Sequence, residues 1–235
     1  EMYYISSGGN WSSATNWRTG SCSGGTTGSV PTSVDNVYIT CGGTINIDAN
    51  SQCNNLTINS GSTLSGGSST LTVYGNISNS GTFTASSGTT NIAGTFTNSG
   101  TFNHSNGTIV FNGTTQTIPS VNYYNLSLSG AGTKTLAGNT NVANNFANSS
   151  TLALGCGKTL AITGTFNNSG TITGTTVGSY AKITVTSTTR TNTGSICNDG
   201  SYLDFCSGGS ASNTLSGTVG ANVSYCTNSA TCALT

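Results

Sequence analysis

One short segment recurs along the chain, and it constrains the fold more than any other feature of the sequence. Four copies align without gaps: GNISNSGTF from Gly75, GTFTNSGTF from Gly94, NNFANSSTL from Asn144 and GTFNNSGTI from Gly164. A fifth copy, LTINSGSTL from Leu56, has one extra residue before its last two. The central asparagines, Asn79, Asn98, Asn148 and Asn168, lie 19, 50 and 20 residues apart. A period of about 20 residues is typical of repeat proteins whose coils stack on one another.

Each copy also carries two apolar positions, six residues apart, on either side of a turn signal. An even spacing puts both positions on one face of an extended chain. The Asn-Ser-Gly between them favours a bend, because Asn and Gly tolerate positive φ. Stacking the copies predicts two buried columns. The first contains Ile58, Ile77, Phe96, Phe146 and Phe166, and the second contains Leu64, Phe83, Phe102, Leu152 and Ile172.

The sequence therefore predicts an all-β protein, a parallel β-solenoid (β-helix) with about 20 residues per coil. The asparagines are expected to form turns, with some hydrogen bonding from coil to coil. An antiparallel sandwich also uses short strands and turn residues. It does not require a constant period with matched columns, so the solenoid is favoured.

The composition excludes several classes of partner. Charged residues make up 4% of the chain, against a usual ~25%, and the net charge is zero. Such a chain offers no electrostatic footprint for nucleic acid or an anionic membrane. No apolar run approaches the ~20 residues of a membrane span. Disorder is disfavoured because Thr, Ile, Val and Phe recur at regular intervals.

Three segments are expected along the chain. Residues 1–53 form an N-terminal cap and the first coil, in which Trp11 and Trp17 cover the open apolar end. Residues 54–189 form the repetitive β-solenoid. Residues 190–235 break the repeat and form Cys-rich, disulfide-stapled C-terminal coils.

The chain has eight cysteines: Cys22, Cys41, Cys53, Cys156, Cys197, Cys206, Cys226 and Cys232. An even number with one histidine favours disulfides in an oxidising compartment over zinc. The expected local pairs are Cys197–Cys206 and Cys226–Cys232. The others are Cys22–Cys41 and Cys53–Cys156, with Cys41 as an alternative partner of Cys53. We expect no free thiol.

Residues that could perform catalysis are few. His104 lies in a turn-like context without an evident partner. The pairs Asp35/Asp48 and Asp199/Asp204 resemble acid and base pairs for glycan cleavage, yet turn capping explains the first pair. Calcium at Asp199 and Asp204 would have few carboxylates. Between residues 50 and 180 the bases are Lys134 and Lys158. We expect no enzyme activity, no metal site and no cofactor.

Threonines suggest a binding surface instead. The pattern T-x-T occurs at Thr82/Thr84, Thr95/Thr97, Thr163/Thr165, Thr171/Thr173 and Thr184/Thr186. Where the middle residue points into the core, both threonines point outward. Stacked rows of this kind resemble the flat face of ice-binding solenoids, and a glycan is the other candidate ligand. The simpler interpretation is that Thr is a good strand former on a solvated face.

Two stretches resemble a known class of proteins. The run from Gly9 to Leu64, which includes VPTSVDNVYITCGGTINIDANSQCNNLTINSGSTL, and the stretch NLSLSGAGTKTLAGNT from Asn125 are similar to secreted, adhesin-like β-helical repeat proteins on the surface of Bacteroidetes-type bacteria. The first run also resembles the glycine-rich N-terminal domain of some extracellular β-helices. The resemblance implies secretion, a cell-surface location and a β-helix fold, and it carries no catalytic residues. A start at Glu1 fits a mature chain whose leader has been removed.

The expected function is that of an extracellular structural protein, a subunit of a self-assembling surface filament or an adhesin. Its partner would be itself, with surface glycans as a further candidate, because the ends of a solenoid expose unpaired strand edges. Head-to-tail contact makes an open filament when it does not close. The contact residues expected are Met2, Tyr3, Tyr4 and Ile5 against Val223 and Tyr225. The alternative is that both ends fold back and cap a monomer.

Overall fold

The computed structural model describes residues 8–174, 181–187 and 189–196, together with the strand backbones of residues 2–5, 180, 202–207, 218–219 and 223–225. Short β-strands joined by turns and bends make up these residues, and the helix among them is one 3-10 turn, η1 (Ala14–Asn16). The chain divides into two compact units, unit 1 (Glu1–Val110) and unit 2 (Phe111–Thr235). This boundary, after Val110, lies inside the segment 54–189 that the sequence predicted as one continuous repeat.

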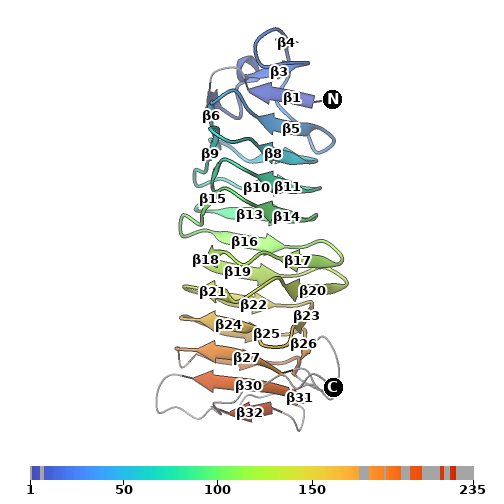
Figure 1. Cartoon of the computed structure of the whole chain (residues 1–235), viewed down its shortest axis with the longest axis vertical. Coiled ribbons are helices and arrows are strands. Elements are labelled where there is room, and N and C mark those ends of the chain that lie inside the picture. The colour runs from blue at the N-terminus through green and yellow to red at the C-terminus, as the bar shows by residue number, and fades with distance from the viewer. Residues whose placement is uncertain are drawn as a thin grey trace. The chain divides into compact units, whose positions relative to one another are not determined.

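Unit 1 is a parallel β-solenoid in which every coil adds one strand to each of three stacks (Figure 1). Stack A1 contains β5 (Asn36–Ile39), β8 (Leu56–Ile58), β11 (Ile77–Asn79) and β14 (Phe96–Asn98). Stack B1 contains β2 (Gly9–Asn10), β6 (Thr44–Asn46), β9 (Thr63–Ser65), β12 (Thr82–Thr84) and β15 (Thr101–Asn103). Stack C1 contains β7 (Ser51–Cys53), β10 (Leu71–Val73) and β13 (Thr89–Ile92), and β16 (Thr108–Phe111) lies at the unit boundary.

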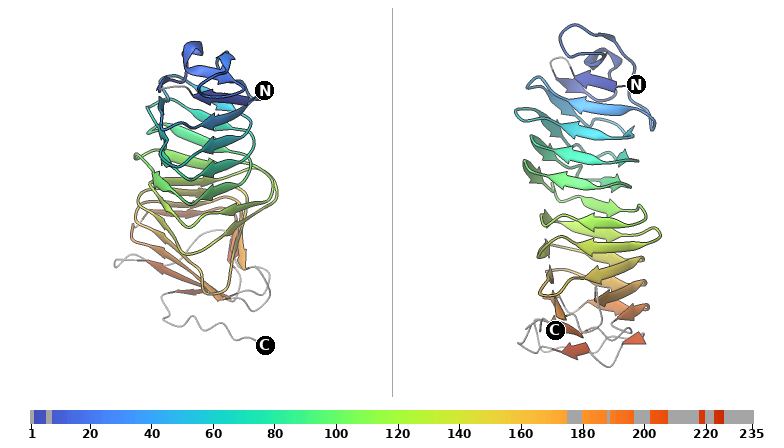
Figure 2. Two further views of the ribbon diagram at one scale, coloured as in Figure 1. Left: turned by 45° about the horizontal axis from the view of Figure 1, so that its top comes forward. Right: turned by 45° about the vertical axis from the view of Figure 1, so that its right-hand side comes forward.

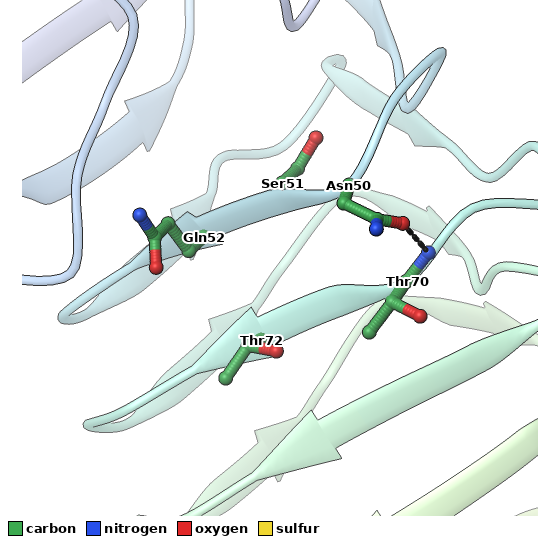
Figure 3. A pocket seen from close by; sticks show the side chains of 5 residues that line it. All are labelled: Asn50, Ser51, Gln52, Thr70 and Thr72. Atoms are coloured by element: carbon green, nitrogen blue, oxygen red, sulfur yellow. Dashed lines mark hydrogen bonds between the residues drawn. The ribbon is translucent and has the colours of Figure 1, made fainter.

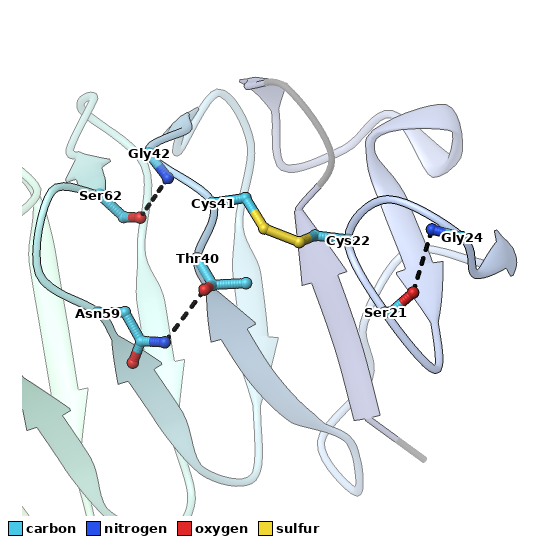
Figure 4. Close-up of a disulfide and its surroundings, with 8 residues drawn as sticks. All are labelled: Ser21, Cys22, Gly24, Thr40, Cys41, Gly42, Asn59 and Ser62. Carbon is cyan, nitrogen blue, oxygen red and sulfur yellow. Dashed lines mark hydrogen bonds between the residues drawn. A yellow bond between two sulfur atoms is a disulfide. The ribbon is translucent and has the colours of Figure 1, made fainter.

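The N-terminal end of unit 1 is closed by its own chain. Strand β1 (Met2–Ile5) pairs in parallel with β5 and antiparallel with β3 (Trp17–Thr19), which in turn pairs with β4 (Thr26–Thr27). Trp11 and Trp17 are fully buried, with ring centroids 4.9 Å apart, and the Trp17 indole donates a hydrogen bond of 2.8 Å to the Trp11 carbonyl. The Cys22–Cys41 disulfide joins the loop after β3 to the bend after β5 (Figure 4).

Unit 2 repeats the three-stack arrangement (Figure 2). Stack A2 contains β19 (Asn125–Leu128), β22 (Phe146–Asn148), β25 (Phe166–Asn168) and β28 (Arg190–Asn192). Stack B2 contains β17 (Gln116–Ile118), β20 (Thr133–Leu136), β23 (Thr151–Leu154), β26 (Thr171–Gly174), β29 (Ser195–Ile196) and β31 (Thr218–Val219). Stack C2 contains β18 (Asn122–Tyr123), β21 (Thr140–Val142), β24 (Thr159–Ile162), β27 (Tyr180–Val185), β30 (Tyr202–Ser207) and β32 (Val223–Tyr225).

The strand register confirms the parallel solenoid and most of the predicted pairs of core residues. In unit 1, Leu64, Phe83 and Phe102 are in register, although Phe102 is only half-buried. In unit 2, Leu152 pairs with Ile172, and Phe146 stacks on Phe166 with a centroid distance of 5.8 Å.

The prediction of one column from Ile58 to Phe166 is wrong in two respects. Ile77 pairs with Leu56, not with Ile58, because the first copy has two extra residues in the bend after Ile58: residues 59–62 lie opposite residues 80–81. Strands β14 and β22, which carry Phe96 and Phe146, belong to different sheets. The 50 residues between Asn98 and Asn148 are not a whole number of coils, so the same motif falls on a different sheet. All three of Phe96, Phe146 and Phe166 are nevertheless buried.

The bend between the A and B stacks contains buried asparagines that bond along the stack. The Asn79 side-chain amide donates to Asn98 Oδ1 (2.6 Å). In unit 2, Asn148 donates to Asn168 (2.8 Å), and Asn168 donates to Asn192 (2.7 Å). Coil-to-coil bonding of the asparagines, predicted as a lesser contribution, is therefore confirmed.

The glycines of the bend fall into two groups. Gly61, in the first copy, has the expected positive φ of 80°, whereas Gly81, Gly100 and Gly170 do not have positive φ. A Cβ atom at Gly100 or Gly170 would instead collide with a carbonyl oxygen of the preceding coil. Glycine is needed here because the backbones of neighbouring coils come close together, not because of a left-handed turn.

Candidate functional site

The outward face of stack B1 carries a complete row of threonines. Four of the five B1 strands, β6, β9, β12 and β15, start with a threonine, then place an apolar residue inward and a polar residue outward. The first outward row is Thr44, Thr63, Thr82 and Thr101, all in register. The second outward row is Asn46, Ser65, Thr84 and Asn103. We call these two rows the B1 threonine face.

Stack B2 carries a second face of the same kind. Its first row is Thr133, Thr151, Thr171 and Ser195, in register. Its second row is Thr117, Thr135, Ala153 and Thr173. Ala153 is buried and interrupts the hydroxyls of this row. We call these two rows the B2 threonine face.

Both faces form a two-dimensional array. Neighbours within a row are about 4.8 Å apart, the spacing of paired strands, and the two rows are about 7 Å apart, the span of two residues along a strand. Within the described part of the chain, no hydrogen bond involves the side-chain hydroxyls of Thr44, Thr63, Thr82 and Thr101, nor those of Thr133, Thr151 and Thr171. These hydroxyls are available to a ligand or to water.

The other outward rows of the same coils are mixed. Stack A1 presents Tyr38, Thr57, Ser78 and Thr97; stack C1 presents Gln52, Thr72 and Asn91; stack A2 presents Ser127, Ala147, Asn167 and Thr191; stack C2 presents Asn122, Asn141, Ala161 and Thr184. The preference of threonine for strands applies to every stack. It does not explain the unbroken row of four threonines on stack B1 or the row of three threonines on stack B2.

Only some of the predicted T-x-T pairs lie on the B1 and B2 threonine faces. Thr82/Thr84 lies on the B1 face and Thr171/Thr173 on the B2 face. Thr97 and Thr184 belong to mixed rows, and Thr163/Thr165 lies outside the strands. The T-x-T pattern misses Thr44 and Thr63, which share another signal: each is a threonine directly before an inward apolar residue at the start of its strand.

A shallow depression of about 330 Å³ lies beside β7 and β10 and is lined by Asn50, Ser51, Gln52, Thr70 and Thr72 (Figure 3). Asn50 Oδ1 accepts a hydrogen bond of 3.0 Å from the Thr70 amide. The lining contains no titratable or nucleophilic cluster, so the depression offers no chemistry beyond weak polar contacts.

The titratable residues singled out in the sequence are not brought together. Asp35 is buried and accepts hydrogen bonds from the amide and hydroxyl of Thr32. Asp48 is exposed and accepts from the amide and hydroxyl of Ser12, and the hydroxyl bond lowers the pKa of its carboxyl. His104 Nδ1 accepts from the Asn106 amide (3.1 Å) in a turn.

The side chains of the second acidic pair, Asp199 and Asp204, are not described. Asp199 lies outside the described residues, and for Asp204 only the strand backbone is described. Among the described residues no group of three His, Cys, Asp or Glu side chains is close enough to hold a metal ion.

Lys134 is a buried cation that sequence reasoning treated only as a base. Its ammonium is fully buried and donates to the carbonyls of Gly113 (2.7 Å), Thr114 (2.7 Å) and Ala131 (3.1 Å). Burial lowers the pKa of this lysine. It occupies the inward position of β20, where its register neighbours are Gln116 and Leu152. The group is structural, because its donors are directed to backbone carbonyls. Lys158 donates to the Ala137 carbonyl (3.2 Å).

The cysteine predictions have mixed outcomes. The Cys22–Cys41 disulfide is confirmed. The Cys53–Cys156 pair and the alternative Cys41–Cys53 pair are wrong, because Cys53 is a free, fully buried thiol, and the expectation of no free thiol fails with them. Cys53 points into the core in register with Val73 and behaves as an apolar residue. Cys156 is disulfide-bonded. The predicted pairs Cys197–Cys206 and Cys226–Cys232 fall outside the residues whose side chains are described.

The predicted assembly contact is based on an open strand edge at the N-terminus, and the strand pairing of β1 does not provide one. Strand β1, with Met2, Tyr3, Tyr4 and Ile5, has β5 on one edge and β3 on the other, so it has no open edge for another chain. The hairpin of β3 and β4 supplies this cover, and sequence reasoning missed it because its two strands are short. In the C-terminal half of the predicted contact, Val223 and Tyr225 lie in β32, which pairs with β30, and nothing further is described there.

No family model, no curated protein and no solved structure matches this chain. Among the described residues, no helix is long and apolar enough to cross a membrane.

Proposed function

We propose that the chain is an extracellular structural protein that serves as a stiff element of a surface adhesin or filament. The observation that carries this proposal is the bonding of buried asparagines from coil to coil, Asn79 to Asn98 in unit 1 and Asn148 through Asn168 to Asn192 in unit 2. These bonds run along the stack and resist separation of neighbouring coils, as in other stacked β structures.

A second set of asparagines supports the same role on the outside of each unit. In unit 1, Asn55 Oδ1 accepts from the Asn76 amide (2.7 Å), and Asn76 Oδ1 accepts from the Thr95 amide (2.8 Å). In unit 2, Asn145 Oδ1 accepts from the hydroxyl of Thr165 (2.6 Å). The abundant asparagines of the chain are thus used to join coils, which suits a load-bearing spacer better than a catalyst.

The extracellular location rests on the cysteines and on composition. A disulfide persists in an oxidising compartment, and Cys22 and Cys41 form one in unit 1. The resemblance to secreted β-helical surface proteins of bacteria points the same way. Asp35 and Asp48, the two aspartates of the N-terminal segment, both accept hydrogen bonds from neighbouring hydroxyls, and we propose a non-catalytic role for them.

The closed N-terminal end favours an adhesin-type spacer over a head-to-tail polymer. The outermost strand at that end is β4, which has two exposed residues, Thr26 and Thr27. A two-residue edge offers few backbone groups to another chain. End-to-end growth, if the protein assembles, has to use this edge rather than β1.

The spacer role can be tested by stretching the full chain from its two ends in a single-molecule force experiment. We expect high unfolding forces. Asn168→Ala should lower them, because it breaks the asparagine ladder, the row of buried asparagines that bond from coil to coil. Asn167→Ala should leave them unchanged, because Asn167 is exposed and lies outside this ladder. Equal forces for all three proteins would overturn the mechanical role of the ladder. Labelling of intact producing cells with an impermeant reagent tests the location, and labelling only after lysis would contradict it.

A further inference from the structure

We propose that the B1 and B2 threonine faces bind the surface of ice. This activity is separate from the spacer role proposed above and can fail without it. Each face presents one row of hydroxyls, four coils long, beside a second outward row in which hydroxyls are mixed with asparagine on B1 or with alanine on B2. The inward side of each stack contains apolar residues such as Leu64 and Leu152.

The array selects a ligand that is itself periodic in two directions. Threonine hydroxyls repeat at about 4.8 Å along each row, and the rows are about 7 Å apart. A hydroxyl donates one hydrogen bond and accepts two, and the first-row hydroxyls have no protein partner among the described residues. A flexible chain or a small molecule meets only a few of these groups at once. A crystal of water offers donors and acceptors as a rigid lattice, so it can meet many together.

The chemistry of the faces disfavours the other occupants. Neither face contains a charged side chain, so an ionic ligand gains nothing there. Neither face contains an aromatic ring, and aromatic rings supply most of the contact area in recognition of flat ligands. A second copy of the chain packed on the face would bury hydroxyls without hydrogen-bond partners, which is unfavourable. An uncharged, hydrogen-bonding lattice is the partner that leaves none of these groups unpaired.

The arrangement is also more than strand preference. Thr57 and Thr63 lie in the same coil, both point outward and both are half-buried. Thr57 belongs to a row that contains Tyr38, whereas Thr63 belongs to an unbroken threonine row. The two positions therefore form a matched pair, in which one residue lies on the proposed surface and the other does not.

Thermal hysteresis and inhibition of ice recrystallisation by the purified full chain test the proposal. We expect both activities in the native protein. The double variant Thr63→Tyr with Thr151→Tyr should lose both, because one bulky ring in each face breaks its flatness. The control Thr57→Tyr with Thr191→Tyr puts the same rings on mixed rows and should keep both activities. Circular dichroism melting of each protein shows that the comparison is between folded chains.

Single-face variants and conservative changes sharpen the result. Thr63→Tyr alone should leave the activity of the B2 face, and Thr63→Ser should reduce activity less than Thr63→Tyr because it keeps the hydroxyl. The proposal is overturned if the native chain shows neither activity, if the double variant retains both while folded, or if the control loses as much as the double variant. Binding to insoluble cellulose or chitin that the double variant abolishes, without any effect on ice, would assign the faces to a polysaccharide instead.

Discussion

Units 1 and 2 have the same bend between their A and B stacks, which we call the corner, but the rest of their coils differ. In both, an asparagine is buried at the bend and the next strand begins with threonine. The ladder step is 19 residues in unit 1, whereas in unit 2 it is 20 and then 24. The corner therefore fixes the register of the stack, while the rest of the coil can lengthen.

The inward columns of the two B stacks differ more than the corners do. Stack B1 is apolar throughout its length, with Ile45, Leu64 and Phe83 in register. Stack B2 begins with two polar residues, Gln116 and Lys134, and becomes apolar only afterwards. A buried polar group is tolerated only when hydrogen bonds satisfy it, and Lys134 has three carbonyl partners.

The ladders also end differently. In unit 1, Ile58 precedes Asn79 in the register, and Asn79 Oδ1 is a buried acceptor without a hydrogen-bond donor among the described residues. In unit 2, Leu128 precedes Asn148, yet Asn148 Oδ1 accepts from the Ser150 amide (3.3 Å). The ladder of unit 1 is thus the shorter and the less completely bonded of the two.

The largest expected effect is loss of an aromatic ring from either core. Phe83→Ala in unit 1 and Phe166→Ala in unit 2 each remove a fully buried ring, and we expect each to lower the free energy of unfolding by about 3–5 kcal/mol. Chemical denaturation with separate probes in the two units measures this. If the units unfold independently, each variant should shift only its own transition, and a shift of both transitions would show that they unfold together.

The next effect concerns the ladders. Asn168→Ala removes a donor to Asn192 and an acceptor for Asn148, so we expect a loss of about 3 kcal/mol. Asn79→Ala should cost about 1 kcal/mol, because it also removes an unpaired oxygen. Asn167→Ala is the control and should change stability by less than about 0.5 kcal/mol. Equal losses for Asn79 and Asn168 would contradict the difference between the ladders.

These two comparisons show what the sequence reveals and what it does not. The pairs Asn79/Asn98 and Phe146/Phe166 could be predicted because their copies are one coil apart and align without gaps. The break between Asn98 and Asn148 could not be resolved, since a gap of 50 residues does not show on which stack the motif resumes. Asn192 was missed because its coil is longer and Arg190 replaces the usual aromatic residue.

The candidate surface shows a similar limit. T-x-T pairs are visible in the sequence, but Thr44, Thr63 and Thr101 are followed two residues later by asparagine or serine and not by threonine. Only the strand register reveals that these residues share one line. The cover on β1 was missed for a related reason: β3 and β4 are too short and too polar to show a strand pattern.

The third prediction tests the polar start of stack B2. Lys134→Met leaves the carbonyls of Gly113, Thr114 and Ala131 without this donor, and we expect a loss of about 2 kcal/mol. Leu64→Met is the matched change at an inward position of stack B1 and should cost under about 1.5 kcal/mol. Denaturant melts of both variants measure the difference. If the Lys134→Met protein is as stable as the native chain, the three hydrogen bonds of the ammonium only offset the free-energy cost of removing it from water.

The smallest expected effect is a pH dependence of stability that comes from the buried Cys53 thiol of unit 1. Burial, and secondarily the charge of Asp35, raises the pKa of the Cys53 thiol far above its ordinary value. In the unfolded chain the thiol ionises near pH ~8.5, so above that pH the unfolded state binds fewer protons than the folded state. Its contribution to stability is therefore complete below pH ~8.5 and is progressively lost in alkali, by under about 1 kcal/mol between pH 7 and 9.

Cys53→Val tests this contribution, because it keeps an apolar side chain beside Val73 and should cost under about 1.5 kcal/mol at pH 7. Denaturant melts at pH 7 and pH 9 should show a smaller alkaline loss in the variant than in the native protein. Tyr123 in unit 2, whose pKa is raised by burial, remains in both proteins and cancels in the difference. A thiol reagent should label Cys53 only after denaturation. An identical alkaline loss in the two proteins, or labelling of the native fold, would place this thiol outside the core of unit 1.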